Sequence, residues 1–489
     1  MSNSVQRIIL AIDIGTSSVK ALALTQSGEE IFQDQQPYTT YHPQPGFSEQ
    51  HPDEIYQAVK KIIRGCSANL KENISAISFS SAMHSIMAVD EQSNPLTPLI
   101  IWSDLRSEEE SKQLQNNTEV LNRFAYTGTP IHPMSPLCKL IWLKKYQPEV
   151  FERAHKFIGI KEFIWHKFFQ HFEIDQGMAS ATGLLKTGTY SWFEEALAIA
   201  GITADKLSVP VSIYHHCLLS NPSILNELGF SKPVNGVIGS SDGCLAHMGS
   251  FALYSDALSL TIGTSGAVRW TVKDNTSTPK ARIFRYHLDE QTLIEGGASN
   301  NGAVLIDWFS KNFLKENINA ETFIQRAMKV SPGAEGLIFL PYVFGERAPV
   351  YNPEASGVFF GIRQHHTTDH FMRAIVEGIG YALYSIVDHA EAQLNYSYLV
   401  ASGGFAHSHE WVQVIADIFG KPVHLNQHEN ASAVGAAMVG FKALGIETTL
   451  LGKPMKVVVP DAKLHSAYQK FYSNFRDLCK RFSDESGKL

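Results

Sequence analysis

The spacing of apolar residues along the chain predicts strands near its beginning. Residues 8–12 and 19–24 are apolar runs on either side of the polar turn Gly15-Thr16-Ser17-Ser18. This pattern is typical of a β-hairpin whose tip carries hydroxyl groups. Shorter runs predict further strands at residues 30–33 and 74–79.

Helical spacing appears between these strands and dominates the middle of the chain. Ile55, Val59, Ile62 and Ile63 recur every three or four residues, which predicts a helix that begins near residue 53 and ends at Gly65. Residues 107–230 are expected to be mainly helical. The alternation of strands and helices indicates an α/β protein.

The opening hairpin has an echo about half a chain later. In residues 258–270, LSLTIGTSGAVRW, the segment 261–266 repeats the segment 13–18, but Thr261 replaces Asp13. The shared letters Gly-Thr-Ser are few enough to recur by chance, although both copies are flanked by apolar strands. A duplicated fold would explain the two hairpins, with only the first retaining a carboxylate.

Helices and one glycine-rich turn organise the second half. Helices are expected at residues 304–313, 369–394, 410–419 and 430–444, the last rich in small residues that suit close packing. A strand at 398–402 runs into Gly403-Gly404, where bare backbone would let a flat ligand lie beside a helix start. A boundary near residue 248 divides the chain into domains 1–248 and 249–489.

Composition and charge exclude several classes of protein. The chain has 489 residues, is 44% hydrophobic and carries a net charge of −7, which argues against nucleic-acid binding through a basic surface. No apolar run is long enough for a membrane span, and the first residues do not resemble a signal peptide, so a cytoplasmic location is expected. The five scattered cysteines suggest neither disulfides nor a zinc motif.

Familiar nucleotide and metal motifs are absent. The sequence contains neither a Walker A pattern nor GxGxxG, and it lacks HExxH. The adjacent pairs His215-His216 and His365-His366 are interpreted as loop residues rather than metal ligands.

The residues themselves suggest phosphate chemistry. The turn at Thr16, Ser17 and Ser18 offers hydroxyl and backbone N–H donors to phosphate oxygens, while Asp13 could hold Mg²⁺ through water. Asp242, in the stretch GSSDG, lies between a strand end and a helix start. It is either the N-cap of that helix or a general base.

Two long segments identify a resemblance. Residues 134–146, MSPLCKLIWLKKY, and 357–377, GVFFGIRQHHTTDHFMRAIVE, match the signatures of the FGGY carbohydrate kinases, with a departure at Tyr146. The chain resembles that family over nearly its full length. The resemblance implies the sugar-kinase/actin/Hsp70 architecture of two ribonuclease-H-like domains, with a cleft between them that closes on substrate.

Within the family the likeness is greatest to the gluconate kinases. It is carried by residues 81–85, 102–106, 297–302 and 345–349, and by Ala82, where ketopentose kinases typically have Gln. The resemblance implies ATP-dependent phosphorylation of the terminal hydroxyl of D-gluconate, giving 6-phosphogluconate. A kinase for D-xylulose or another ketopentose is the alternative. A non-kinase ATPase like actin or Hsp70 is a more distant one.

The resemblance also implies roles for individual residues. Asp242 would be the general base, and Asp13 would hold Mg²⁺ for ATP. Met83, His84 and Asp104 would contact the sugar, with His84 donating to a hydroxyl, and Arg106 would meet the carboxylate or lie on the surface. The nucleotide would be held by the two turns and the diglycine: Thr16, Ser17, Ser18, Gly263, Thr264, Ser265, Gly403 and Gly404. A homodimer is compatible with this picture, and no nucleic-acid or membrane partner is expected.

Overall fold

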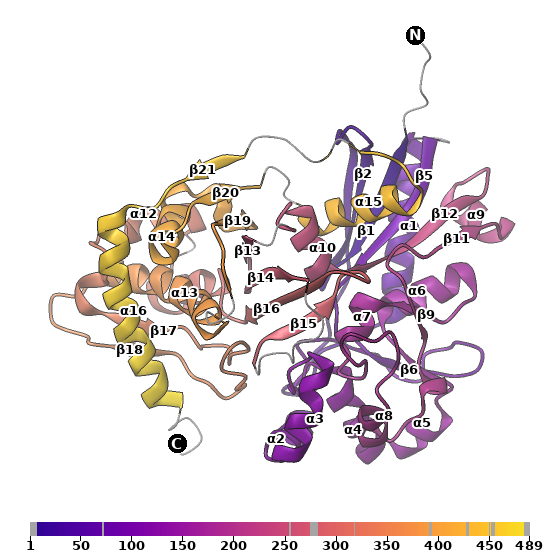
Figure 1. The fold of residues 1–489 in the computed structure, drawn as a ribbon, viewed down its shortest axis with the longest axis horizontal. Coiled ribbons are helices and arrows are strands. Elements are labelled where there is room, and N and C mark those ends of the chain that lie inside the picture. Colours follow the sequence, from indigo (N-terminus) through magenta and orange to yellow (C-terminus); the bar gives the residue numbers. More distant parts are fainter. Residues whose placement is uncertain are drawn as a thin grey trace, which may run out of the picture.

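Two β-sheets with helices on their faces form the two halves of the molecule (Figure 1). The computed structural model describes residues 7–70, 73–253, 256–273, 282–316, 318–390, 394–426, 430–448, 450 and 455–483. The first residues, on which the predicted location partly rests, lie outside this range. Among the described residues, no helix combines the length and the apolar character needed to cross a bilayer.

The first sheet has the strand order β11-β12-β5-β1-β2-β3. Strands β1, β2 and β3 form an antiparallel meander, and β5 and β12 then extend the sheet in parallel to β1. Its strands are β1 (Ile8–Ile14), β2 (Ser18–Thr25), β3 (Glu30–Pro37), β5 (Ile74–Ser81), β11 (His216–Leu219) and β12 (Val234–Ser241). The predicted hairpin and the strands that follow it are confirmed.

The second sheet repeats this arrangement. Its order is β15-β16-β14-β13-β19-β20-β21, in which β13, β14 and β16 form the meander and β19 and β20 run parallel to β13. Its strands are β13 (Ala257–Ile262), β14 (Gly266–Val272), β15 (Phe284–His287), β16 (Leu293–Ser299), β19 (Tyr398–Ser402), β20 (Val423–Leu425) and β21 (Lys456–Val458). Two copies of one topology confirm the predicted α/β duplication.

The register of the two sheets makes the duplication visible at single residues. Asp13 of β1 pairs with Ser80 of β5, and Thr261 of β13 pairs with Ser402 of β19. In both places the two side chains are joined: Ser80 Oγ donates to Asp13 Oδ1 at 2.7 Å, and the Thr261 and Ser402 hydroxyls lie 2.8 Å apart. The replacement of Asp13 by Thr261 therefore keeps the contact and removes the charge.

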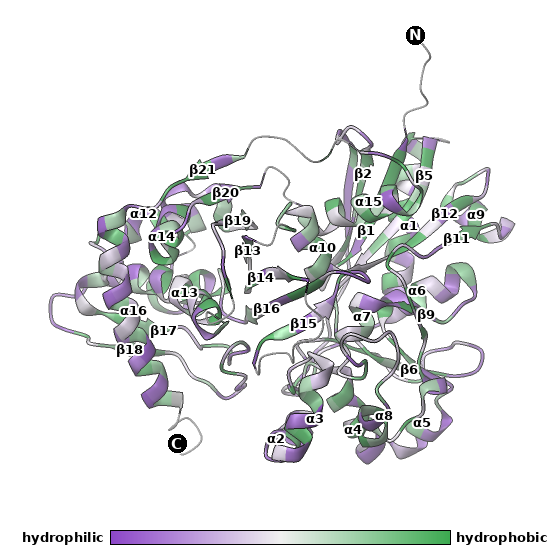
Figure 2. Cartoon of the chain, in the orientation of Figure 1, coloured by the Kyte–Doolittle hydropathy of each residue, from purple (hydrophilic) through white to green (hydrophobic). Residues whose placement is uncertain are grey.

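Helices cover both sheets, and apolar residues concentrate on the strands beneath them (Figure 2). Helices α1 (Pro52–Leu70) and α6 (Ile160–Phe169) share an apolar core with one face of the first sheet. Helix α13 (Thr368–Ala390) lies in the core of the second half. The prediction that α1 ends at Gly65 was wrong, because Cys66 and Ser67 remain buried and continue its apolar face.

The remaining elements lie mostly in the helical insertion of the first half. The helices there are α2 (Glu108–Gln115), α3 (Thr118–Phe124), α4 (Pro136–Tyr146), α5 (Pro148–Arg153), α7 (Gln176–Ser180), α8 (Glu194–Ala200) and α9 (Pro222–Leu228). The second half adds α11 (Val304–Phe309), followed by a π-helical turn (Ser310–Leu314), α12 (Ala320–Ala327), α14 (His409–Phe419) and α16 (Ala462–Ser483). The short strands are β4 (Glu49–Gln50), β6 (Met87–Val89), β7 (Leu99–Ile100), β8 (Lys156–Ile158), β9 (Glu173–Asp175), β10 (Val209–Val211), β17 (Ile338–Leu340) and β18 (Val358–Phe360).

Two small-residue helices join the halves. Helix α10 (Asp242–Gly249) packs against α15 (Ala431–Ala443), which also shares a core with strands of the first sheet. A Cβ at Gly249 would lie 1.9 Å from the Ala431 carbonyl oxygen, and one at Gly435 would lie 2.1 Å from that of Leu245. The prediction that this glycine- and alanine-rich helix packs closely on a neighbour is confirmed. The division at residue 248 remains a prediction.

Candidate active site

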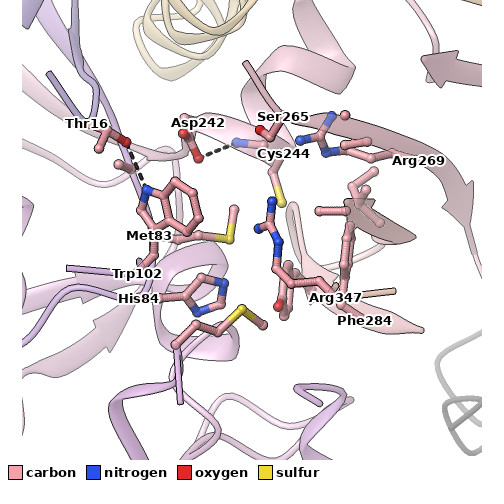
Figure 3. A pocket seen from close by; sticks show the side chains of 18 of the residues that line it. Thr16, Met83, His84, Trp102, Asp242, Cys244, Ser265, Arg269, Phe284 and Arg347 are labelled. Carbon is pink, nitrogen blue, oxygen red and sulfur yellow. Dashed lines mark hydrogen bonds between the residues drawn. The ribbon is translucent and has the colours of Figure 1, made fainter. Parts of the chain in front are cut away.

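A cavity of about 180 Å³ lies where the two halves meet, and residues from both of them line it (Figure 3). Thr16, Met83 and Asp242 come from the first half, and Ser265 comes from the second. The tips of both duplicated hairpins therefore reach the same cavity.

Each hairpin tip is a closed turn. The Gly15 N–H donates to the Ser18 carbonyl at 3.0 Å, and the Gly263 N–H donates to the Ser265 carbonyl at 2.9 Å. Ser17 and Thr264 are exposed at the two tips. Ser18, in contrast, is buried in β2, and its hydroxyl accepts from Gln35 Nε2 at 2.8 Å. The side chain of Ser18 thus lies within the sheet, whereas those of Thr16 and Ser17 lie at the tip of the turn.

Asp13 is held at the end of β1 by two serines. Ser80 Oγ donates to one of its oxygens at 2.7 Å, and Ser432 Oγ, at the start of α15, donates to the other at 2.6 Å. A carboxylate has about four acceptor positions, so two remain for water molecules. The set of hard oxygen donors fits Mg²⁺ bound through water.

Asp242 is the first residue of α10, and its side chain lines the cavity. The N-cap of the helix is Ser241, whose hydroxyl accepts from the Cys244 N–H. Asp242 Oδ1 accepts from the Gly243 N–H at 2.7 Å. Burial and the nearby Asp13 carboxylate raise the pKa of Asp242 to about 6, against a lowering by Arg269. A carboxylate that titrates close to neutral pH is suited to accept a proton.

Met83 and His84 lie in the loop after β5 and line the cavity. His84 Nδ1 lies 2.7 Å from the Ala181 carbonyl, which can only accept, so this nitrogen carries the proton. Burial and the charge of Lys139 lower the pKa of His84 to about 3, and the ring is therefore neutral. Its Nε2 is then an acceptor, so the prediction that His84 donates to a hydroxyl was wrong.

Asp104 and Arg106 do not reach the cavity. Asp104 is fully buried and accepts from the Ser48 N–H and from the Arg106 guanidinium, at 2.6 and 2.8 Å. Arg106 also pairs with Glu49 and lies 4.0 Å from the centre of the Phe47 ring. The prediction that Asp104 binds sugar hydroxyls was wrong, because its oxygens are committed to this buried ion pair, and Arg106 is neither a cavity residue nor a surface residue.

The diglycine follows β19 beside the second hairpin. Gly403 has a φ of +91°, and a Cβ there would lie 2.6 Å from the Ile262 carbonyl oxygen. A Cβ at Gly404 would meet no atom within 4 Å. The first glycine is required by the close approach to β13, and the second leaves open space in front of the backbone.

Comparison with known proteins decides the family. Residues 8–249 match the N-terminal domain of the FGGY family of carbohydrate kinases, and residues 258–444 match its C-terminal domain. The chain belongs to the FGGY family of carbohydrate kinases. The predicted family and enzyme class are confirmed.

Relatives of this FGGY kinase differ in the substrates that their names state. A gluconokinase from Bacillus licheniformis is 38% identical over 98% of this chain and 96% of its own length. A xylulose kinase from Staphylococcus epidermidis is 29% identical, over 98% of this chain and 97% of its own length. The crystal structure of a gluconate kinase from Lactobacillus acidophilus superposes with a TM-score of 0.93 at 30% identity, covering 99% of both chains.

The FGGY kinase has cavity residues that the sequence patterns did not single out. Arg269 and Arg347 both line the cavity, as does Trp102, whose Nε1–H donates to Thr16 Oγ1 at 2.9 Å. Arg269 interrupts the apolar strand that follows the second turn. A charged residue inside an apolar strand is a signal that could have identified Arg269 as a functional residue. Arg347 lies in the segment 345–349 that carried the family likeness, but no pattern gave it a role.

Proposed function

We propose that this FGGY kinase transfers the γ-phosphoryl group of ATP to the terminal hydroxyl of D-gluconate, giving 6-phosphogluconate. The observation that carries the proposal is the position of Asp242, a carboxylate with a pKa near 6 in a cavity that both hairpin turns reach. The greater identity to a gluconokinase than to a xylulose kinase supports gluconate as the acceptor.

Phosphoryl transfer requires positioning and charge neutralisation more than covalent chemistry from the protein. The phosphates of ATP would be held by N–H and hydroxyl groups of the turns at residues 15–17 and 263–265. The adenosine would lie against Gly403 and Gly404. Mg²⁺ held through water at Asp13 would neutralise charge on the phosphates.

The acceptor would be held on the other side of the transferred group. Asp242 would take the proton of the terminal hydroxyl as the new bond forms. His84 Nε2 would accept a hydrogen bond from another hydroxyl, and Met83 would pack against the carbon chain. Closure of the two halves would exclude water and limit the hydrolysis of ATP.

A coupled ADP-release assay with separate acceptors tests this proposal. We expect strong stimulation by D-gluconate and weak stimulation by D-xylulose, D-ribulose and glycerol. Stimulation by a ketopentose alone would overturn gluconate and favour the xylulose alternative. ADP release that is independent of every acceptor would instead indicate an ATPase like actin or Hsp70. Cytoplasmic location and a homodimer remain predictions.

A further inference from the structure

The cavity holds two guanidinium groups, and they differ in how they are satisfied. Arg347 Nη2 donates to the Ser299 carbonyl at 3.2 Å, and its guanidinium lies 5.0 Å from the centre of the Trp102 ring. The buried carboxylate of Glu346 also acts on Arg347 and raises its pKa against the effect of burial. Arg347 is therefore anchored within the protein, although its Nε has no hydrogen-bond partner among the described residues.

Arg269 has no such anchor. It projects from β14, and within the described part of the chain its guanidinium makes no hydrogen bond and no ion pair within 4 Å. A Cβ at Gly243 would lie 3.4 Å from Arg269 Nε, so the guanidinium lies close to the start of α10. An unpaired guanidinium at the wall of a cavity is costly unless a ligand supplies the opposite charge.

The charges of the cavity lining point to the nature of that ligand. The lining contains two arginines and one carboxylate, Asp242, while His84 is neutral. Glu346 offsets the charge of Arg347, and Asp242 acts on Arg269 without an ion pair within 4 Å. Within the described part of the chain the guanidinium donors of Arg269 therefore have no acceptor, and a sugar acid supplies one as its carboxylate, whereas a neutral sugar does not.

We propose that Arg269, with Arg347 beside it, binds the carboxylate of gluconate and makes the enzyme select a sugar acid over a neutral sugar. Figure 3 shows Asp242 on one side of the cavity and both guanidinium groups on the other. An open-chain acid is flexible enough to place its terminal hydroxyl at Asp242 and its carboxylate at the arginines, of which Arg269 lies beside the start of α10. This inference rests on the proposed function and adds the residue that determines specificity.

The test compares D-gluconate with D-gluconamide, its neutral analogue, in the wild type and in Arg269→Gln. We expect the wild type to favour gluconate by about a hundredfold in kcat/KM, as for a desolvated charge pair. The preference should fall to a few-fold in Arg269→Gln, because kcat/KM for gluconate should fall much further than kcat/KM for gluconamide, which declines only as the pKa of Asp242 rises without Arg269. Arg269→Lys should retain part of the preference, and an unchanged melting temperature shows that the variants are folded.

The outcomes separate this inference from the function on which it rests. A matched control is Arg326→Gln, which removes an arginine that pairs with Asp369 far from the cavity lining and should keep the full preference. An unchanged preference in Arg269→Gln would overturn the inference alone. Equal losses for gluconate and gluconamide would assign Arg269 to the transferred phosphoryl group and also overturn it. A wild type that phosphorylates neither substrate would overturn the proposed function itself.

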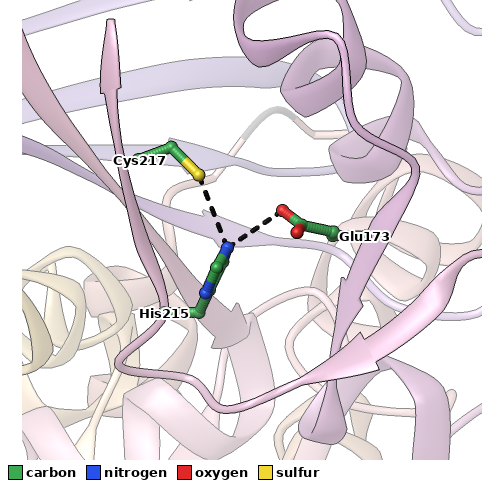
Figure 4. Close-up of side chains that lie close together, drawn as sticks. All are labelled: Glu173, His215 and Cys217. Carbon is green, nitrogen blue, oxygen red and sulfur yellow. Dashed lines mark hydrogen bonds and ion pairs between the residues drawn. The ribbon is translucent and has the colours of Figure 1, made fainter.

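A second cluster, away from the cavity, carries an independent inference. Glu173 of β9, Cys217 of β11 and His215, which directly precedes β11, converge at the edge of the first sheet (Figure 4). His215 Nε2 lies 3.0 Å from Glu173 Oε2 and 3.4 Å from Cys217 Sγ. A ring nitrogen carries at most one hydrogen, and it cannot point that hydrogen at both partners.

The two distances from His215 Nε2 match the coordination of a zinc ion, and all three ligand atoms lie within 4.8 Å of one another. For tetrahedral Zn²⁺ with ordinary bond lengths, the nitrogen would lie about 3.3 Å from the oxygen and about 3.6 Å from the sulfur. The observed distances lie within a few tenths of an ångström of these values. We propose that Glu173, His215 and Cys217 bind one thiophilic divalent cation such as Zn²⁺, with water as the fourth ligand. This revises the interpretation of His215 as a simple loop residue.

Cobalt substitution tests the metal site without reference to activity. Addition of Co²⁺ to the metal-free protein should produce a thiolate-to-metal charge-transfer band that saturates at one ion per chain, and Zn²⁺ should abolish the band. Cys217→Ser and His215→Ala should remove it. The neighbouring His216→Ala and the remote Cys479→Ser should retain it, since these residues lie outside the cluster. Absence of the band, or its survival in Cys217→Ser, would overturn the proposal.

Discussion

Replacement of Asp242 by Asn should abolish turnover and make the protein more stable. The change keeps the shape of the side chain and removes its charge. A pKa of about 6 in place of 3.8 means that ionising Asp242 in the folded protein costs about 3 kcal/mol more than in the unfolded chain. Because the side chain is partly exposed, solvent screening reduces the expected gain to about 2 kcal/mol.

The sign of the effect follows from the direction of the pKa shift. The folded state holds its proton more tightly, so the ionised carboxylate destabilises the fold above pH 6, and the penalty disappears below about pH 4. Thermal unfolding of the wild type and Asp242→Asn should therefore differ by about 2 °C at pH 7 and converge in acid. Over the same range, loss of the general base should lower kcat by at least about 10²-fold while ATP binding is retained.

The prediction requires both results together, a loss of kcat and a higher melting temperature. An inactive variant that melts earlier than the wild type would mean that activity was lost through damage to the fold, and it would refute the electrostatic reasoning. A fully active variant would refute the assignment of the base. Asp53→Asn, which changes a first-turn residue of α1 away from the cavity lining, serves as the control and should not alter kcat.

Three further predictions follow from the geometry. The value of kcat/KM for gluconate should fall about tenfold per pH unit below pH 6 as Asp242 is protonated. A pH–rate profile of Asp242→Asn should lack this fall in its residual activity. Gly403→Ala should lower the melting temperature because of its positive φ and the nearby Ile262 carbonyl, whereas Gly404→Ala should leave it unchanged and raise KM for ATP alone. Lys139→Met should destabilise the protein by about 3 kcal/mol or more, since Lys139 Nζ donates to the carbonyls of His84, Ile101 and Met134, and should raise KM for gluconate.

The fold was largely predictable because its signals are local. The apolar runs around the two Gly-Thr-Ser turns predicted both hairpins, and the structure repeats the same strand order around each. The end of α1 was missed because a glycine at a helix surface is tolerated where the apolar face continues beyond it. Such a choice depends on packing against the sheet, which the local pattern does not contain.

The sequence predicted site residues only where the end of a strand determines the position of the residue. Asp13 and Asp242 stand at strand ends that meet at one edge, and their positions follow from the topology. The role of Asp104 could not be predicted in this way. Asp104 pairs with Arg106, two residues away, and the pair is covered by Phe47, which is distant in sequence. Whether a carboxylate binds a ligand or an internal arginine is decided by contacts of this kind.

The exchange of Asp13 for Thr261 between the hairpins would assign different parts of the proposed reaction to the two halves. A carboxylate at Thr261 would sit at the edge of the cleft and repel both the phosphates and the charge on Asp242, as Asp13 already does. The Thr261–Ser402 contact preserves the geometry of the Asp13–Ser80 contact without that charge. On the proposed function, neutrality in the second hairpin would let both turns bind phosphate and would confine the metal to the first half. It would also leave the positive charge of Arg269 available to the carboxylate of the acceptor.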